Sequence, residues 1–286
     1  MANDGHESAL FCITNSGCGV NDCRSQTIIF SGAGAGTIHP AFFCSSSEHE
    51  ARFPTIRYPG WTRYVENGFT AQKLVEELAA RVSLLVPEGS IRIIGTSLGG
   101  HLAYAAALRL QAGGRKIGGF CAIDTFTTAS ASPMAGWKGR ALKTGAALLW
   151  DRRMDEFGRF LRSRFWRALL RLAGDRLQVL MQKIAPSGRL PKILEVDPLF
   201  EEELSMRLLL MEAAPWVALL NRDPVPLRAP AVLLRTRFTG DADFLWRRRC
   251  PGIKVVEIAG DHDTLFDAEN PSSVRDPFLA ASSDWS

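Results

Sequence analysis

The residues with the clearest chemical potential form a short turn, Gly95-Thr96-Ser97-Leu98-Gly99. The turn follows an apolar run, Ile91 to Ile94, that is typical of a buried strand, and it precedes a helical pattern rich in Ala and Leu. In this strand–turn–helix context the G-x-S-x-G spacing forces a tight turn that leaves the serine hydroxyl exposed. The Leu98 N–H, at the start of the helix, is placed to stabilise an oxyanion. The pattern predicts Ser97 as a nucleophile, against the alternative of a chance match in a surface turn.

A serine hydroxyl also needs a base to accept its proton. The chain has five histidines, and only His262 follows directly after a late predicted strand, 253–258. The carboxyl edge of a parallel sheet would bring His262 to Ser97. We therefore expect His262 to be the base, with a solvated loop histidine as the alternative.

The acid that orients the histidine has two possible positions. Asp124 directly follows a predicted strand over 117–123, next to the serine unit. Asp241 and Asp243 follow a predicted strand over 231–235 instead. We favour Asp124 and keep the Asp241/Asp243 pair as the alternative.

A loop of small residues, Ser31-Gly32-Ala33-Gly34-Ala35-Gly36, follows the first predicted strand. A phosphate-binding loop would need G-K-[ST], and a dinucleotide site would need G-x-G-x-x-G with a later acidic residue. Neither pattern fits the G-x-G-x-G spacing well. A loop of this kind also brings a backbone N–H to an oxyanion, and Ala33 is the predicted donor.

The predicted elements alternate as strand 27–30, strand 53–60, helix 71–85, strand 91–94, the helix after Ser97 and strand 117–123. This alternation indicates a parallel sheet with right-handed crossovers. Residues 126–225 show only helical patterns, with a break expected at Pro215, before the last two strands. The order Ser, Asp, His is that of the α/β-hydrolase fold. We predict one domain over 1–286: a mostly parallel sheet with helices on both faces and a helical lid inserted at 126–225.

Length, charge and composition restrict the partners and the cellular location that we expect for the protein. The chain has 286 residues and a net charge of +4, too small to indicate a nucleic-acid partner. No apolar run is long enough to span a membrane, and the amino terminus does not look like a secretory signal. The six cysteines lack metal-site spacing. These features predict reduced thiols in a cytoplasmic protein that holds no metal.

The chain resembles the α/β-hydrolase thioesterases of nonribosomal peptide and polyketide synthases. The resemblance rests on IIFSGAGAG for the oxyanion loop, YPG in the next strand-turn, IIGTSLGGHLAYAAALRL for the serine elbow, FCAIDT for the acid and IAGDHDTLF for the histidine loop, together spanning residues 27 to 266. An acid at the FCAIDT position is typical of the synthase-terminal type, whereas editing thioesterases carry it nearer the histidine.

The resemblance implies a serine thioesterase that releases an acyl, polyketide or peptidyl chain from a carrier protein by hydrolysis or cyclisation. Ser97, Asp124 and His262 would be catalytic, and Ala33 and Leu98 would form the oxyanion hole. No cofactor is implied, although the substrate would be carried on phosphopantetheine. No carrier domain precedes residue 27, so we expect action in trans. A carboxylester hydrolase or lipase with the same triad, or a non-catalytic binding protein, are the alternatives.

The predicted lid is strongly basic between residues 138 and 189, with thirteen Lys or Arg and four Asp or Glu. Five arginines alternate there with Phe and Leu: Arg159, Arg162, Arg164, Arg167 and Arg171. Three interpretations stay open. The residues form a solvated helix face, a docking surface for an acidic acyl or peptidyl carrier protein, or, less favoured, a basic helix on anionic membrane.

Overall fold

The computed structural model describes residues 25–32, 38–44, 53–126, 154–192, 200–237, 242–262, 265–266 and 271–285. Three features predicted from the sequence lie outside these residues: Ala33, Asp241 and the part of the inserted segment at 127–153.

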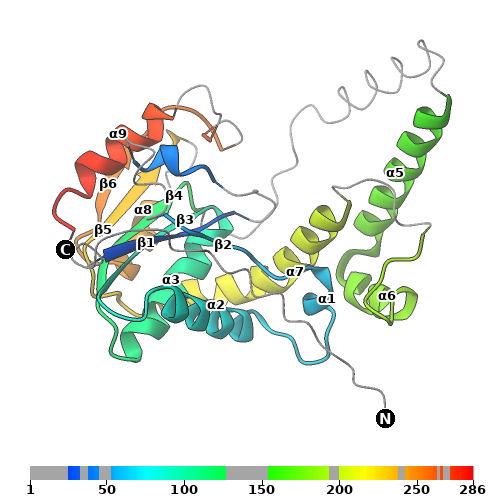
Figure 1. Cartoon of the computed structure of the whole chain (residues 1–286), viewed down its shortest axis with the longest axis horizontal. Coiled ribbons are helices and arrows are strands. Elements are labelled where there is room, and N and C mark those ends of the chain that lie inside the picture. Colours follow the sequence, from blue (N-terminus) through cyan, green and yellow to red (C-terminus); the bar gives the residue numbers. More distant parts are fainter. Residues whose placement is uncertain are drawn as a thin grey trace, which may run out of the picture.

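Six parallel strands form one sheet in the order β2-β1-β3-β4-β5-β6 (Figure 1). Their bounds are Ser25–Phe30 for β1, Thr55–Ile56 for β2, Ser90–Thr96 for β3, Ile117–Ile123 for β4, Ala231–Arg235 for β5 and Lys254–Glu257 for β6. The predicted parallel sheet is confirmed. The predicted strand at 53–60 contracts to two residues, which pair with the end of β1.

Helices cover both faces of the sheet because alternate strand residues point in opposite directions. Ile28, Ile93 and Phe120 face the side that also carries α2 (Ala71–Leu85), α3 (Leu98–Ala112) and α8 (Ala242–Arg249). Ile29 and Ile94 face the other side, with the 3₁₀ helix η1 (Pro40–Phe42) and α9 (Ser272–Ala281). The core is therefore two apolar layers separated by the sheet, as the α/β-hydrolase prediction requires.

Helix α2 shows how local sequence sets an element. Thr70 caps it by accepting a hydrogen bond from the Lys73 N–H at 3.2 Å. Leu74, Leu78 and Val82 recur at helical spacing and are fully buried against the core. The predicted bounds, 71–85, agree with the structure.

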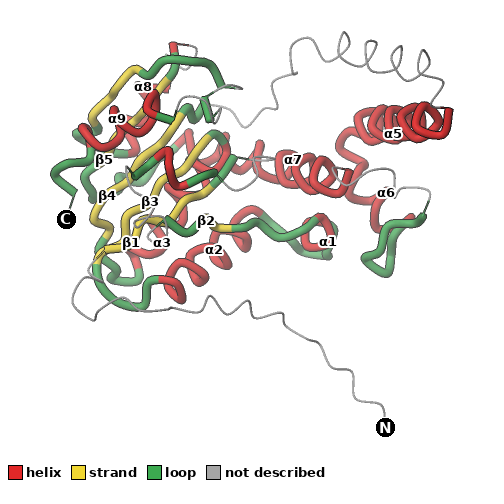
Figure 2. Tube along the Cα trace, turned by 45° about the horizontal axis from the view of Figure 1, so that its top comes forward, coloured by secondary structure: helices red, strands yellow, loops and turns green. Residues whose placement is uncertain are grey.

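The segment between β4 and β5 is helical in its described part, with α5 (Met154–Ala173), the 3₁₀ helix η3 (Gly174–Arg176), α6 (Leu177–Ile184) and α7 (Phe200–Arg222). Helix α7 packs against α1 (Trp61–Tyr64) and α2, while α5 and α6 extend away from the sheet (Figure 2). The expected break at Pro215 is wrong, because α7 continues through it. Buried contacts on one side of α7 offset the single hydrogen bond that proline removes. No helix in the described segments is long and apolar enough to cross a membrane.

Close packing of the serine turn against the sheet depends on glycine. A Cβ on Gly99 would lie 2.3 Å from the carbonyl oxygen of Ser31, and one on Gly95 would lie 2.6 Å from the carbonyl oxygen of Gly99. Both neighbours are backbone atoms that cannot move aside. The start of α3 therefore sits on the end of β1 at a distance that only glycine permits.

We predict that Gly99→Ala lowers the free energy of unfolding by about 1–3 kcal/mol, the usual cost of overpacking. The matched control is Gly158→Ala in α5, where a new Cβ meets nothing within 4 Å. That change should be neutral or stabilise the helix by about 0.5–1 kcal/mol. Denaturant unfolding measures both. Equal effects of the two substitutions would contradict the steric explanation.

Candidate active site

Ser97 occupies the turn between β3 and α3 in a strained conformation. Its φ is 51° and its ψ is −127°, a backbone conformation that residues other than glycine rarely adopt. Its N–H donates to the carbonyl of Ile123 at 3.0 Å, so the ends of β3 and β4 are joined at the serine. Leu98 is the first residue of α3, so its N–H has no partner within the helix. The elbow predicted from G-x-S-x-G is present.

Asp124 follows β4 directly and is the other described non-glycine residue with a positive φ, at 45°. Its carboxylate is buried, and Oδ1 accepts from both the N–H and the hydroxyl of Thr236, at 3.1 and 2.7 Å. Burial by itself raises the pKa of Asp124. The hydrogen bonds from His262 and Thr236 outweigh burial and hold the pKa below its usual value. Asp124 is therefore an ionised carboxylate at neutral pH.

His262 lies after β6 and meets Asp124 across the sheet edge. Its Nδ1 is 2.7 Å from Oδ2 of Asp124, and its side chain is 35% exposed. The ring of Phe126 packs on the imidazole, with ring centres 4.8 Å apart. Because an ionised carboxylate only accepts, Nδ1 carries a proton, so in the neutral ring Nε2 keeps its lone pair. The structure thus gives His262 the tautomer that a general base needs.

Asp243, one of the two alternative acids, forms an ion pair with Arg235. Asp243 lies in the first turn of α8, and Oδ1 is 3.3 Å from Nε of Arg235. Asp241, the other alternative, and Ala33, the predicted oxyanion donor, lie outside the described residues. Of the two possible positions, the structure brings Asp124 to His262 and pairs Asp243 with an arginine.

One polar residue near the site was not among the predicted site residues. His101, four residues after Ser97 on α3, is buried, and it contacts both the Phe126 carbonyl and Arg249. No spacing pattern connects His101 with Arg249, which lies 148 residues away. The position of His101 one helical turn after Ser97 was the only signal in the sequence.

A cavity of about 640 Å³ opens beside the serine turn. Gly32 lines it, and a Cβ on Gly32 would lie 3.1 Å from the Cβ of Ser97. The segment 55–62 and the first turns of α7 form its other walls, including Tyr58 and Met206. The cavity therefore leads from the Ser97 turn toward α7.

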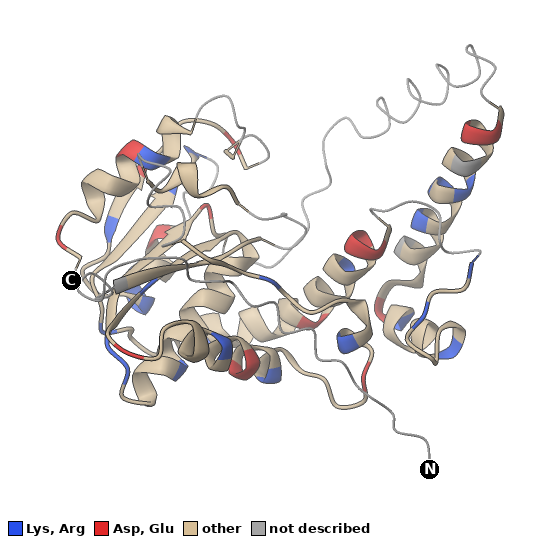
Figure 3. Ribbon diagram, viewed as in Figure 1, with Lys and Arg blue, Asp and Glu red and all other residues tan. Residues whose placement is uncertain are grey.

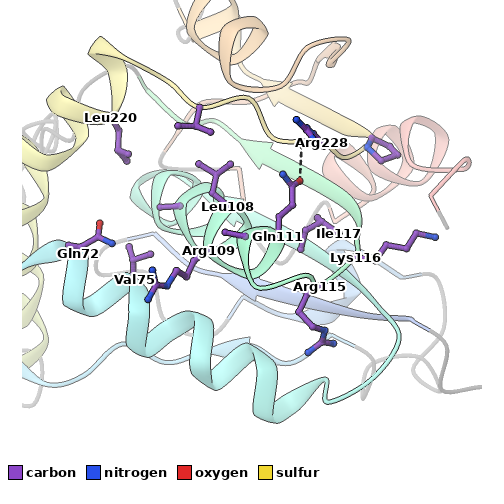
Figure 4. Close-up of a pocket in the computed structure, with 14 residues that line it drawn as sticks. Gln72, Val75, Leu108, Arg109, Gln111, Arg115, Lys116, Ile117, Leu220 and Arg228 are labelled. Atoms are coloured by element: carbon purple, nitrogen blue, oxygen red, sulfur yellow. Dashed lines mark hydrogen bonds between the residues drawn. The ribbon is translucent and has the colours of Figure 1, made fainter.

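A second cavity, of about 820 Å³, lies at the opposite edge of the sheet (Figure 4). Ile117 and Pro230, at the amino ends of β4 and β5, line it together with the end of α3. Ser97, Asp124 and His262 all lie at carboxyl ends of strands. The larger cavity is therefore remote from these residues, and the basic side chains around it point in different directions (Figure 4).

Within the described residues, no group of three or more His, Cys, Asp or Glu side chains has an arrangement that could hold a metal ion. Asp124 and His262 are engaged with each other at 2.7 Å. The imidazole of His262, held by the Asp124 carboxylate, could accept or donate a proton at this edge of the sheet, which also carries the Ser97 turn.

Solved structures share this fold. The NocB thioesterase domain, in covalent complex with a fluorophosphonate nocardicin G analogue, aligns with TM-score 0.50 and 18% identity over 90% of this chain and 94% of that one. The Vlm2 thioesterase domain aligns with TM-score 0.51 and 21% identity over 89% of this chain and 93% of that one. A four-domain nonribosomal peptide synthetase, holo-AB3403, aligns with TM-score 0.52 and 19% identity over 89% of this chain but 19% of that one.

Sequence comparison identifies the family. No curated protein sequence matches the chain. The family model of the thioesterase domain matches residues 27–275, which include the serine turn, Asp124 and His262. The resemblance noted from the sequence motifs is confirmed at the level of the family and the fold. The chain belongs to the thioesterase domain family.

Proposed function

We propose that this chain is a serine thioesterase that releases an acyl or peptidyl chain from a carrier-protein thioester through an acyl-enzyme. The observation that supports this most is the 2.7 Å contact between Asp124 and His262 at the sheet edge that also carries the strained Ser97 turn. The match to the thioesterase domain family supports a thioester as the bond that is cleaved.

In the proposed first step, the hydroxyl oxygen of Ser97 attacks the thioester carbonyl while Nε2 of His262 accepts its proton. Asp124 keeps the Nδ1 proton in place and stabilises the imidazolium that forms. The Leu98 N–H, with Ala33 as the proposed second donor, stabilises the oxyanion. When the tetrahedral intermediate collapses, the carbon–sulfur bond breaks and His262 returns the proton to the phosphopantetheine thiolate.

In the second step, water or a nucleophile within the chain attacks the acyl-enzyme, and His262 accepts and returns a proton again. The 640 Å³ cavity beside Gly32 is the proposed site of the acyl chain, since it begins next to Ser97. Both apolar and polar residues line this cavity, among them Tyr58, Met206, Glu201 and Ser205. A chain with polar groups, such as a peptidyl or oxidised polyketide chain, fits this lining better than a saturated fatty chain does.

The proposed partner surface, called the α5–α6 surface, lies on α5, on α6 and on the 3₁₀ helix η3 between them. Figure 3 shows basic residues along α5 and α6. Arg162, Arg176 and Lys183 are exposed, and Leu161 and Phe165 of α5 are 51% and 61% exposed. Arg167 is excluded from this surface because it pairs with Glu203 and its side chain is only 14% exposed. A basic surface with apolar residues is complementary to an acidic carrier protein.

The first prediction concerns the nucleophile. Ser97→Ala should keep the fold and reduce turnover of a thioester substrate by at least about 10³-fold. It should also abolish covalent labelling by a fluorophosphonate, which reacts with activated serine. A non-catalytic binding protein would show no labelling even of the native chain. A native enzyme that cleaves oxyesters faster than matched thioesters would be a carboxylester hydrolase instead.

The second prediction concerns the acid. Asp124→Asn should lower kcat by up to about 10⁴-fold, because asparagine can donate to Nδ1 and favours the wrong imidazole tautomer. Asp243→Asn is the matched control, since it alters a carboxylate that pairs with Arg235. Steady-state kinetics on a soluble thioester compares them. A larger loss with Asp243→Asn would reassign the acid.

The third prediction concerns carrier docking. Exposed charges are screened over about 8–10 Å at physiological salt, so kcat/KM for a carrier-bound substrate should fall steeply as salt rises. Kinetics with a small uncharged thioester should hardly change. Reversing charge at Arg162, Arg176 and Lys183 should weaken only the carrier-bound reaction.

The control reverses the same number of exposed charges at the opposite edge of the sheet, with Lys116→Glu, Arg228→Glu and Arg247→Glu. If both triple variants act alike, the α5–α6 surface is not the docking site. Release from anionic vesicles by the α5–α6 variant alone would assign that surface to a membrane.

A further inference from the structure

A buried polar network lies behind the Asp124 turn and has no role in the mechanism above. Its centre is Arg249 of α8, which is 0% exposed. Its guanidinium donates to Oδ1 of Asn221 at 2.5 Å and lies over the rings of Tyr104 and Trp246, at 4.6 and 4.9 Å. Within the described residues no carboxylate forms an ion pair with it. The aromatic faces and neutral acceptors stabilise its charge instead.

The same guanidinium fixes the proton of His101. Nη1 of Arg249 is 2.8 Å from Nδ1 of His101. Arginine can only donate, so Nδ1 must be an acceptor without a proton. Burial, and then the charge of Arg249, lower the pKa of His101 to about 3, so the ring is neutral at physiological pH. The single ring proton is therefore on Nε2.

That proton points at the turn that follows Asp124. Nε2 of His101 is 2.8 Å from the carbonyl oxygen of Phe126, which accepts the hydrogen bond. Phe126 stands two residues after Asp124, and its ring packs on the imidazole of His262. The carbonyl held by His101 thus belongs to the residue that forms one wall for His262.

The turn from Asp124 to Phe126 needs such support because Asp124 has a positive φ. Hydrogen bonds to its backbone groups help hold the turn: the Asp124 N–H donates to the Leu234 carbonyl, the Trp246 indole N–H donates to the Thr125 carbonyl at 3.4 Å, and His101 donates to the Phe126 carbonyl. The last of these is the one nearest in sequence to the ring that contacts His262.

We propose that His101 is a positioning residue: with its proton fixed on Nε2 by Arg249, it holds the Phe126 carbonyl so that the Phe126 ring packs against His262. The catalytic consequence rests on the proposed function, in which His262 is the general base. The hydrogen-bond arrangement itself does not depend on that function.

The first test reads the tautomer directly. Nitrogen-15 NMR of histidine-labelled protein distinguishes a bare ring nitrogen from a protonated one, and the His101 signals are assigned by their loss in His101→Gln. We expect a bare Nδ1 and a protonated Nε2. A proton on Nδ1, or an imidazolium, would overturn the proposal whether or not the chain is an enzyme.

The second test compares His101→Leu with His101→Gln. Glutamine can accept from Arg249 and donate to the Phe126 carbonyl, whereas leucine can do neither. His101→Leu should lower kcat by about 10- to 100-fold with little change in KM, as expected when a catalytic group is displaced. His101→Gln should restore most of kcat. Leu110→Ala, at the far end of the same helix, is the control for loss of stability and should leave kcat unchanged.

The third test adds Phe126→Ala, which removes the ring but keeps the carbonyl. If His101 acts through that ring, His101→Leu should cost no more than about twofold in kcat in the Phe126→Ala background. Its effect on the melting temperature should persist.

The proposal would be overturned if His101→Leu and Phe126→Ala lowered kcat independently, so that their effects multiplied. It would also be overturned if His101→Leu and His101→Gln lowered kcat equally, because His101 would then contribute only to packing. A native chain that shows no fluorophosphonate labelling would refute the proposed function instead. The NMR measurement, and the cost of each variant to stability, then still decide the hydrogen-bond arrangement. If His101→Leu fails to fold, the glutamine variant and the native spectrum carry the test.

Discussion

The buried carboxylate of Asp124 is the interaction on which the candidate site depends. One oxygen accepts two hydrogen bonds from Thr236, and the other meets His262. A buried charge without partners is costly, so these donors compensate the lost hydration and keep the group ionised. They come from the end of β5 and from the loop after β6. The same hydrogen bonds therefore join three neighbouring segments and place the histidine.

Backbone strain is concentrated where the chemistry is proposed. Ser97 and Asp124 are the two described non-glycine residues with positive φ, and they follow adjacent strands. The hydrogen bond from Ser97 N–H to Ile123 ties the two strained turns together. Gly99 lets α3 press on the end of β1, and His101 reaches from the same helix to the turn after Asp124. Helix α3 thus supports both turns at once.

The inserted helices divide into two parts with different relations to the core. Helix α7 buries Leu204, Leu208 and Val217 against it and forms one wall of the cavity beside Ser97. Helices α5 and α6 leave large apolar and basic side chains exposed. In the proposed function, the first part contacts the acyl chain and the second part meets the carrier protein. This division agrees with the sequence, which is basic between residues 138 and 189 and supplies the buried apolar residues of α7 after residue 200.

The sequence alone determined the elements whose cause is local. Short apolar runs predicted β4 and β5, helical spacing of apolar residues predicted α2, and the spacing of Gly95, Ser97 and Gly99 predicted the elbow, because these patterns act over a few residues. The position of Asp124 after its strand favoured it over the Asp241/Asp243 pair, but only the tertiary structure showed that Asp124 contacts His262, which lies 138 residues away. The contacts of His101 with Phe126 and Arg249 could not be predicted for the same reason. Hydrogen bonds between distant segments depend on how strands and helices assemble, and no short sequence pattern records that assembly.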